Sequence, residues 1–188
     1  MSLYLVRHTT PAINSGICYG QTDLDLAASA EQDIQRVRDR LPDQISQVYS
    51  SPLRRCTKLA LRLTDNTVEI RPALSELNFG AWEMQPWDTI PRADLDAWAK
   101  NIIDYAPANG ESLNLMQQRV LSCWQQICTT RSKRDDTVVV THAGVIRVIH
   151  AFEMGWPIHK MFDLTISYGG ILRLSHGCAA TKPVPQIL

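Results

Sequence analysis

The chain has 188 residues, of which 45% are hydrophobic, and this is enough apolar material for one domain with a full core. Lysine plus arginine and aspartate plus glutamate number 19 each, so the basic excess typical of nucleic-acid-binding proteins is missing. The first residues lack the pattern of a signal peptide, and charged residues interrupt the longest apolar stretches. We therefore expect a single cytoplasmic domain, residues 1–188, with neither nucleic acid nor a membrane as its partner.

The five cysteines predict neither a zinc site nor a network of disulfides. They form no C-x-x-C pair, and their number is odd. We expect reduced and mostly buried thiols, with Cys18 in a loop near the predicted site.

The first half of the chain predicts three strands separated by two helices. The strands are Leu3–Arg7, Ile45–Tyr49 and Val68–Ile70. Ser51 and Pro52 predict the start of the second helix, with Ser51 as its N-cap and Pro52 in its first position. The apolar residues that recur at helical spacing are Ile34, Val37 and Leu41 in the first helix and Leu53, Cys56, Ala60 and Leu63 in the second.

The middle of the chain has no clear periodicity. Three tryptophans, Trp82, Trp87 and Trp98, are scattered among charged residues in this region. We expect a lid or insertion at about residues 71–112, with a helix around Ala93–Tyr105.

The last third of the chain returns to regular patterns. Ser112 predicts the N-cap of a helix that continues through Ile127. A strand at Thr137–Thr141, a helix at Ala143–Met154 and a final strand near Gly170–Leu174 follow. Strands that alternate with helices indicate a three-layer α/β fold, in which helices cover both faces of a mainly parallel sheet. For the last strand we also allow an antiparallel direction.

Basic side chains and histidines follow three of the predicted strands. Arg7-His8 ends the first strand, Arg54-Arg55 lies in the first turn of a helix, and His142-Ala143-Gly144 opens another helix. In an open α/β sheet, ligands bind beyond the carboxyl ends of the strands, and helix N-termini and arginine forks both favour phosphate. Each feature alone is more simply explained as an exposed basic pair or a buried histidine. Together they predict an enzyme that handles phosphate.

The motifs around these junctions resemble those of the histidine phosphatase superfamily, also called the phosphoglycerate-mutase-like family. They occur in the family's order and are Arg7-His8-Thr9, the segment from Ser51 to Arg55, the segment from Leu74 to Glu83, Gly110-Glu111-Ser112 and the segment from Thr141 to Gly144. The sequence departs from the family's pattern at several positions, among them Thr10, Ala27 and Ala30. Thr9 replaces the glycine that usually follows the first histidine, and Met84 stands where a glycine often follows Trp-Glu. None of these departures removes a residue of the catalytic set.

The resemblance implies a covalent mechanism that needs no metal or other cofactor. His8 would be the nucleophile and become a phosphohistidine, and Glu76 would protonate the leaving alcohol and then activate water. Imidazole suits the first role because it is largely unprotonated near neutral pH. The residues implied as ligands of the phosphate oxygens are Arg7, Arg55 and His142, with Asn14 as a further donor.

The acid role and the substrate contacts are less sharply defined by the sequence. Glu83 and Glu111 compete with Glu76 as the general acid. The loops Gly16–Asp23 and Asn78–Glu83 resemble the α-ribazole phosphatase branch, and this resemblance implies hydrolysis of α-ribazole 5′-phosphate to α-ribazole in cobalamin biosynthesis. The expected substrate-binding residues are Asn14, Tyr19, Gly20, Gln21, Trp82, Glu83 and Ala143, although packing of the site wall is the simpler role for Trp82.

Four other functions stay open: a broad-specificity sugar-phosphate phosphatase, a phosphoglycerate mutase, a non-catalytic phosphate-binding protein and a metallohydrolase that uses His8 and His142. The mutase usually has longer insertions around its site. The complete catalytic set argues against the binding protein, and the lack of an H-E-x-x-H pattern argues against the metallohydrolase. The expected partner is a small phosphomonoester, and a homodimer is open.

Overall fold

The computed structural model describes residues 2–132 and 135–174. Five strands form one sheet in the order β3-β2-β4-β1-β5. Strands β1 to β4 run parallel, whereas β5 pairs with β1 in the antiparallel direction. The predicted α/β fold with a mainly parallel sheet is therefore confirmed, and its last strand is antiparallel. The strands are β1 (Leu3–Arg7), β2 (Gln47–Ser50), β3 (Val68–Ile70), β4 (Thr137–Thr141) and β5 (Ile171–Leu174).

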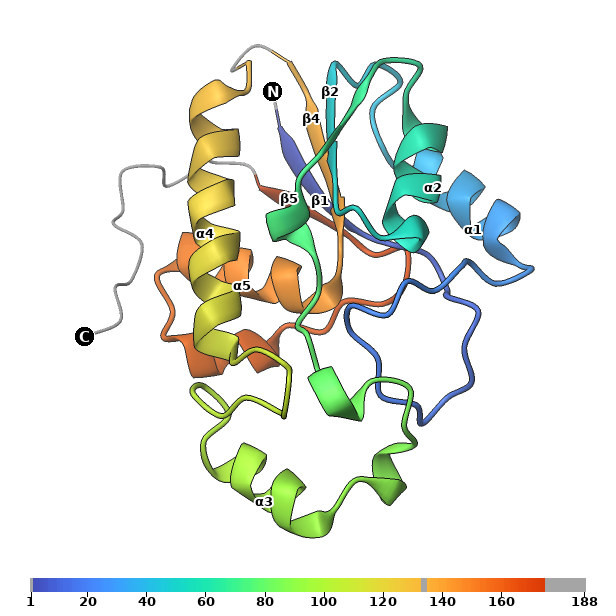
Figure 1. Ribbon diagram of the computed structural model, residues 1–188. Helices are drawn as coiled ribbons and strands as arrows, with labels where there is room; N and C mark the ends of the chain where they lie inside the picture. Colours follow the sequence, from blue (N-terminus) through green and yellow to red (C-terminus); the bar gives the residue numbers. More distant parts are fainter. Residues whose placement is uncertain (1, 133–134, 175–188) are drawn as a thin grey trace.

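Helices cover both faces of this sheet (Figure 1). On one face lie α1 (Ala30–Arg38) and α2 (Arg54–Leu63), and on the other lie α4 (Leu113–Thr130) and α5 (Ala143–Met154). Alternate residues of β1 enter different layers: Leu3 and Leu5 pack with α4 and α5, while Tyr4 and Val6 pack with α1 and α2. Because both faces are covered, the central strands are continuous apolar runs in the sequence.

The start of α2 differs from the prediction. Leu53 is the N-cap of α2, so Ser51 and Pro52 lie outside the helix. The Ser51 hydroxyl oxygen is 3.4 Å from the backbone nitrogen of Leu53 and 2.8 Å from Nε2 of His142. The expectation that Ser51 is the N-cap is therefore wrong, and its buried hydroxyl contacts both the N–H of Leu53 and the imidazole of His142.

The helix inside the middle segment and the helix after it differ in how closely they match the prediction. Helix α3 (Arg92–Lys100) ends at Asn101 and does not reach Tyr105, because turns replace the helix there. Helix α4 begins as predicted, since the Ser112 hydroxyl accepts a hydrogen bond from the backbone N–H of Leu115 at 3.3 Å.

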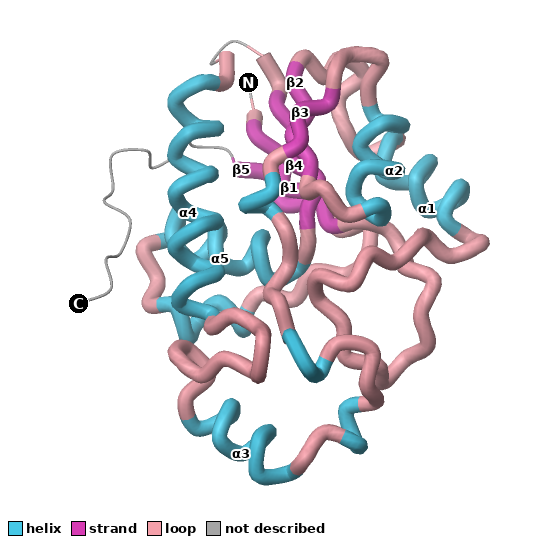
Figure 2. The backbone as a smooth tube through the Cα atoms, viewed as in Figure 1, coloured by secondary structure: helices cyan, strands magenta, loops and turns pink. Residues whose placement is uncertain are grey.

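Long loops gather beyond the carboxyl ends of β1 and β4 (Figure 2). Residues 71–112 contribute three short 3-10 turns and α3 to this region, and a further 3-10 segment, Ile158–Asp163, follows α5. The middle segment builds a small aromatic core of its own around Trp82, where Trp87, Trp98 and Tyr105 pack. That this segment moves as a lid stays a prediction.

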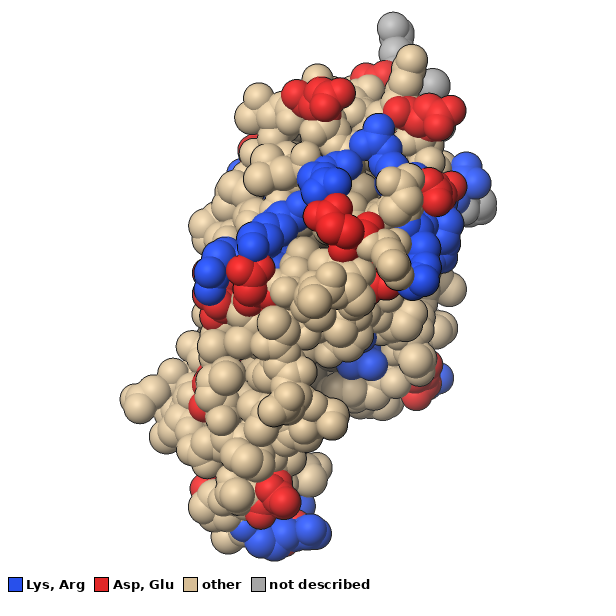
Figure 3. All heavy atoms as spheres, turned by 90° about the vertical axis from the view of Figure 1, so that its right-hand side faces the viewer, with Lys and Arg blue, Asp and Glu red and all other residues tan. Residues whose placement is uncertain are grey.

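Positive and negative side chains are interspersed on the face that carries α1 and α2 (Figure 3). Ion pairs join Arg54 to Asp23 and Arg62 to Glu31, and Lys58 pairs with Asp25. The basic row along α2 is therefore largely balanced by acidic neighbours.

Two further expectations concern the cysteines and membrane-spanning helices. Cys18, Cys56 and Cys123 are free and buried, but Cys128 is disulfide-bonded, so the expectation of reduced thiols is wrong there. Cys178 lies outside the described residues. No helix within residues 2–132 and 135–174 is long and apolar enough to cross a membrane.

Candidate active site

Two histidines meet at the carboxyl ends of neighbouring strands. His8 follows β1 and His142 follows β4, and these strands pair so that Arg7 lies opposite Thr141. The centroids of the two imidazole rings are 5.2 Å apart, and both side chains are buried. The parallel pairing of β1 with β4 thus brings two residues far apart in the sequence into one site.

The His8 imidazole has one nitrogen free for nucleophilic attack. Its Nδ1 lies 2.7 Å from the carbonyl oxygen of Thr9. Because a carbonyl oxygen only accepts hydrogen bonds, Nδ1 carries the proton and Nε2 keeps its lone pair. Burial and the charges of Arg55 and Arg7 lower the pKa of His8 to about 3, although the bond to Thr9 acts in the opposite direction. The ring is therefore neutral near pH 7.

The second imidazole lies with its ring against the first. His142 is fully buried, and Nε2 contacts both the Ser51 hydroxyl and, at 3.4 Å, the sulfur of Cys56. Burial lowers the pKa of His142 well below its ordinary value, and nearby His8 and Arg55 act in the same direction. This ring is neutral as well.

Two arginines flank His8, and each has an unused donor. Arg7 donates to the carbonyl oxygen of Ile166 at 2.7 Å, and its guanidinium carbon lies 3.9 Å from the centre of the Tyr168 ring. Arg55 donates to the carbonyl oxygen of Thr22 at 2.8 Å. The Nε of each arginine is buried without a hydrogen-bond partner in the described part of the chain. Buried charged donors are costly when unpaired, and phosphate oxygens are acceptors that would satisfy them.

Glu76 is the one carboxylate among the described residues that line the cavity beside His8. Its two oxygens accept hydrogen bonds from the backbone N–H groups of Leu77, at 3.0 Å, and Gly144, at 3.1 Å. A Cβ atom at position 144 would lie only 2.3 Å from Oε1 of Glu76. Glycine at this position therefore lets the carboxyl group reach the start of α5.

The two rival glutamates have structural environments. Glu83 accepts hydrogen bonds from the backbone N–H groups of Gly20, Gln21 and Thr22, from the Thr22 hydroxyl and from the N–H of Phe79. Burial alone raises the pKa of Glu83, but these hydrogen bonds outweigh it and the pKa is lowered. Glu111 pairs with Arg119 through both of its oxygens. Neither glutamate lines the cavity.

The cavity itself has a volume of about 330 Å³ and joins the basic end to an apolar wall. A volume of this size suits a small organic ligand. Arg7, His8, Arg55 and Glu76 line it together with Tyr19 and Ala143. The apolar side chains of the wall are Ile17, Leu77, Phe79, Trp87, Trp98, Ile102, Leu113, Met116, Met161 and Phe162.

Residues 3–181 match the sequence pattern of the histidine phosphatase superfamily, branch 1. The chain belongs to this family. Its similarity to the adenosylcobalamin/alpha-ribazole phosphatase of Escherichia coli is 29% identity over 177 residues, which cover 90% of this chain and 87% of that protein. Its similarity to the metal-independent phosphoserine phosphatase of Arabidopsis thaliana is 27% identity over 161 residues, or 79% of this chain and 66% of that protein.

A solved structure resembles this histidine phosphatase in its fold as well as its sequence. The crystal structure of the alpha-ribazole phosphatase from Shigella flexneri superposes with a TM-score of 0.83 at 26% identity. The match covers 92% of this chain and 89% of that one. These three relatives are named as phosphatases, for more than one substrate, whereas another, from Erwinia tasmaniensis, is named as a probable phosphoglycerate mutase.

Several residues expected to bind substrate do not line the cavity of this histidine phosphatase. The backbone N–H groups of Gly20 and Gln21 donate to the carboxylate of Glu83, so these three residues hold loops together around the cavity. Trp82 is buried in the aromatic core behind the wall. Asn14 is exposed and lines a separate hollow. None of these five residues lines the cavity.

Other residues at this site were missed in the sequence. Phe79, Trp98 and Phe162 line the wall, Tyr168 stacks on Arg7, and Arg119 binds the segment that carries Glu76. The cluster of tryptophans in an otherwise polar segment was the signal that could have identified the wall. For Tyr168 no signal was available, because it lies in the loop before β5. Among residues 2–132 and 135–174, no group of three metal-ligating side chains lies close enough to hold an ion.

Proposed function

We propose that the protein hydrolyses phosphate monoesters through a phosphohistidine formed on His8. The observation that carries this proposal is the free Nε2 of a neutral His8 beside two arginines with unpaired buried donors. Nε2 would form a bond to phosphorus while the bond from phosphorus to the ester oxygen breaks. Arg7 and Arg55 would neutralise charge on the equatorial oxygens, and His142 would be a further donor to them.

Glu76 would serve both halves of the reaction. In the first half, its proton goes to the departing oxygen, so that the product leaves as an alcohol. In the second half, the same carboxylate takes a proton from water as the water oxygen attacks phosphorus. The bond from phosphorus to Nε2 then breaks, inorganic phosphate leaves, and the lone pair returns to His8.

For the substrate we propose α-ribazole 5′-phosphate. Its benzimidazole base is flat and apolar, and Phe79, Trp87 and Trp98 provide an aromatic wall in the same cavity as His8. The names of the relatives from Escherichia coli and Shigella flexneri support the same choice. Cobalamin biosynthesis, a cytoplasmic location and independence from metal ions stay predictions that accompany this proposal.

Phosphoserine is the second candidate substrate. Arg147 of α5 lines the cavity, with its Nε bonded to the carbonyl oxygen of Leu164 at 2.9 Å. The guanidinium group of Arg147 could pair with a substrate carboxylate, and one relative is named as a phosphoserine phosphatase. The mostly apolar lining of the cavity favours α-ribazole 5′-phosphate over this small polar substrate.

The deciding experiment compares α-ribazole 5′-phosphate with ribose 5-phosphate and phosphoserine, all in excess EDTA. Ribose 5-phosphate has the same reacting group but lacks the aromatic base. Burying that base should raise kcat/KM by ~30–150-fold, since a large apolar group contributes about 2–3 kcal/mol when buried. The variant His8→Ala should lose turnover and the acid-labile phosphoenzyme, whereas the exposed His159→Ala should lose neither.

Each other result points to a different function. Equal kcat/KM for the two ribose esters would indicate a broad-specificity phosphatase, and a preference for phosphoserine would support the second candidate. A phosphoenzyme that survives in His8→Ala would overturn the nucleophile. Activity that disappears in EDTA would overturn the metal-free mechanism.

A further inference from the structure

The segment that carries Glu76 has no regular secondary structure. A 3-10 turn ends at Leu74, and residues 75–79 follow without helix or strand. A carboxyl group that transfers protons must nevertheless be held in a narrow range of positions. The order of this segment must therefore come from contacts with other elements.

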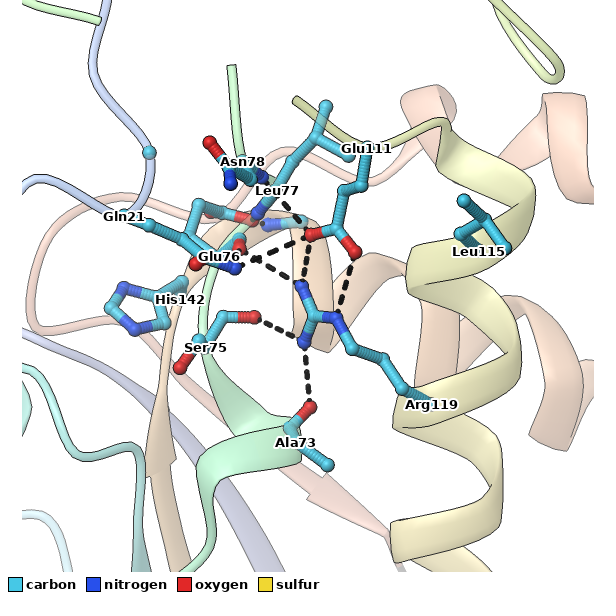
Figure 4. Close-up of polar contacts among 12 residues, drawn as sticks. Gln21, Ala73, Ser75, Glu76, Leu77, Asn78, Glu111, Leu115, Arg119 and His142 are labelled. Atoms are coloured by element: carbon cyan, nitrogen blue, oxygen red, sulfur yellow. Dashed lines mark hydrogen bonds and ion pairs between the residues drawn. The ribbon is translucent and has the colours of Figure 1, made fainter. Parts of the chain in front are cut away.

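One side chain of α4 supplies most of these contacts. The guanidinium group of Arg119 donates to three backbone carbonyl oxygens of the segment (Figure 4). Its Nη1 lies 2.8 Å from the oxygens of both Ala73 and Ser75, and its Nη2 lies 2.9 Å from the oxygen of Glu76. A planar guanidinium can bind several acceptors at fixed angles, which the ammonium group of lysine cannot do.

Glu111 completes the arrangement on the other side of Glu76. Its carboxylate pairs with Arg119, with Oε2 at 2.9 Å from Nε, and its Oε1 accepts from the backbone N–H of Asn78 at 3.0 Å. The Gln21 amide adds a bond to the carbonyl oxygen of Glu76 at 3.0 Å. The backbone is thus held immediately before, at and after Glu76. We call Arg119 and Glu111 together the clamp.

We propose that the clamp positions Glu76 for proton transfer, an inference that rests on the proposed function. Arg119 and Glu111 do not line the cavity, so they act through the backbone of the segment and not on the substrate. With the backbone held, the carboxyl group of Glu76 meets the N–H of Gly144 at the edge of the cavity. Arg119 and Glu111 are therefore positioning residues.

A positioning role for the clamp makes a prediction that depends on the leaving group. In the first half-reaction, the bond from phosphorus to the ester oxygen breaks and the Glu76 proton goes to that oxygen. An alkyl alcohol needs this proton, whereas 2,4-dinitrophenolate leaves without one. A loose clamp should therefore slow alkyl esters and spare dinitrophenyl esters. General loss of structure would slow both.

The test uses 2-phenylethyl phosphate and 2,4-dinitrophenyl phosphate with the wild type, Arg119→Met, Arg119→Lys and Glu111→Gln. The measured quantity is kcat/KM, because it covers only the steps up to departure of the alcohol. We expect Arg119→Met to lower kcat/KM by ~10–10²-fold for the phenylethyl ester, part of the usual contribution of a general acid. The dinitrophenyl ester should change by less than about threefold.

A matched control is available on β3. Arg71 pairs with Glu69 and is 27% exposed, close to the 24% of Arg119, but its side chain binds none of the three carbonyl groups. Arg71→Met should therefore leave the ratio of the two kcat/KM values unchanged. The double variant Glu76→Gln/Arg119→Met should lose no more on the phenylethyl ester than Glu76→Gln alone, because both changes remove the same function.

Equal losses on both esters, additive losses in the double variant, or no loss at all would overturn the clamp. If Arg119→Met does not fold, the ratio of kcat/KM for the two esters in Arg119→Lys and Glu111→Gln decides the question. Acid quenching, which detects the phosphoenzyme, separates failure of the clamp proposal from failure of the proposed function. A wild type that forms no His8-dependent phosphoenzyme overturns both, whereas a wild type that forms it while the variants lose both esters equally overturns the clamp alone.

Discussion

Glu76 and Glu83 show how strongly the surroundings decide what a carboxylate does. Both belong to one motif, yet Glu76 accepts two hydrogen bonds at the edge of the cavity, while Glu83 accepts five, four from residues 20–22 and one from Phe79. A carboxylate so fully bonded and with a lowered pKa is a poor proton donor. Its task is to hold the loop of Gly20 against the start of the middle segment.

Replacing Glu76 by glutamine should therefore lower activity, whereas replacing Glu83 by glutamine should lower stability. Glu76→Gln should lower kcat/KM for alkyl esters by ~10²–10⁴-fold with little change in stability. Glu83→Gln should lower the free energy of unfolding by about 1–3 kcal/mol, because an amide cannot accept from all five donors. Urea denaturation and steady-state kinetics on the two variants measure both effects. If Glu83→Gln costs more activity and less stability than Glu76→Gln, the acid role passes to Glu83.

At the scale of elements, the loop after Trp82 contains an unfavourable residue. Met84 has a φ of +65°, in the left-handed region, and its side chain is 49% exposed. The family often has glycine here, and the backbone conformation gives the reason, since only glycine adopts it without strain. The N–H of Met84 bonds to the carbonyl oxygen of Cys18 at 2.7 Å, so the turn is held in place despite its cost.

Met84→Gly should raise the free energy of unfolding by up to about 1 kcal/mol, because relief of left-handed strain exceeds the entropy that glycine adds to the unfolded chain. Thermal unfolding should show a rise in Tm of up to about 4 °C for a chain of this size. Met84→Ala is the matched control, since it removes the same exposed side chain but keeps the strain. Equal Tm values for the glycine and alanine variants would show that the turn is not strained.

At the scale of the whole molecule, burial of two neutral histidines ties stability to pH. The pKa of His8 is lowered to about 3 in the folded state, and that of His142 is lowered as well. In the unfolded chain both titrate near their ordinary pKa of about 6.5. Between these values the unfolded state binds more protons, so stability rises with pH and is lost as the pH falls below about 6.5.

Each histidine should contribute a slope of about 1.4 kcal/mol per pH unit within that window. The measurement is the free energy of unfolding in urea from pH 7 down to the acid limit of folding. His8→Asn should reduce the slope by about 1.4 kcal/mol per pH unit, the contribution of one proton. His159→Asn, at an exposed position, should leave the slope unchanged. An identical slope in wild type and His8→Asn would mean that His8 is already charged in the folded protein.

Local patterns in the sequence were sufficient for most elements and for the family. The runs Leu3–Arg7 and Thr137–Thr141 are apolar enough to specify buried strands, and both strands have the predicted bounds. Ser112 caps α4 as expected because its hydroxyl needs only the nearest N–H groups. The family's motifs at strand ends are also local, which is why the sequence alone identified them.

The tertiary structure decided what depends on neighbours that are distant in the chain. The pairing of β1 with β4 brings His8 and His142 together, as their expected roles around one phosphate require, but only the packed loops show that Glu76 lines the cavity while Glu83 and Glu111 do not. Ser51 contacts His142 and is not the expected cap, and Asn14 lines a different hollow, because both placements depend on loop packing. By itself, the sequence determined the residue types, the short-range elements and the family. Strand order and loop packing assigned the side chains to the site, because contacts between distant segments leave no periodic pattern in the sequence.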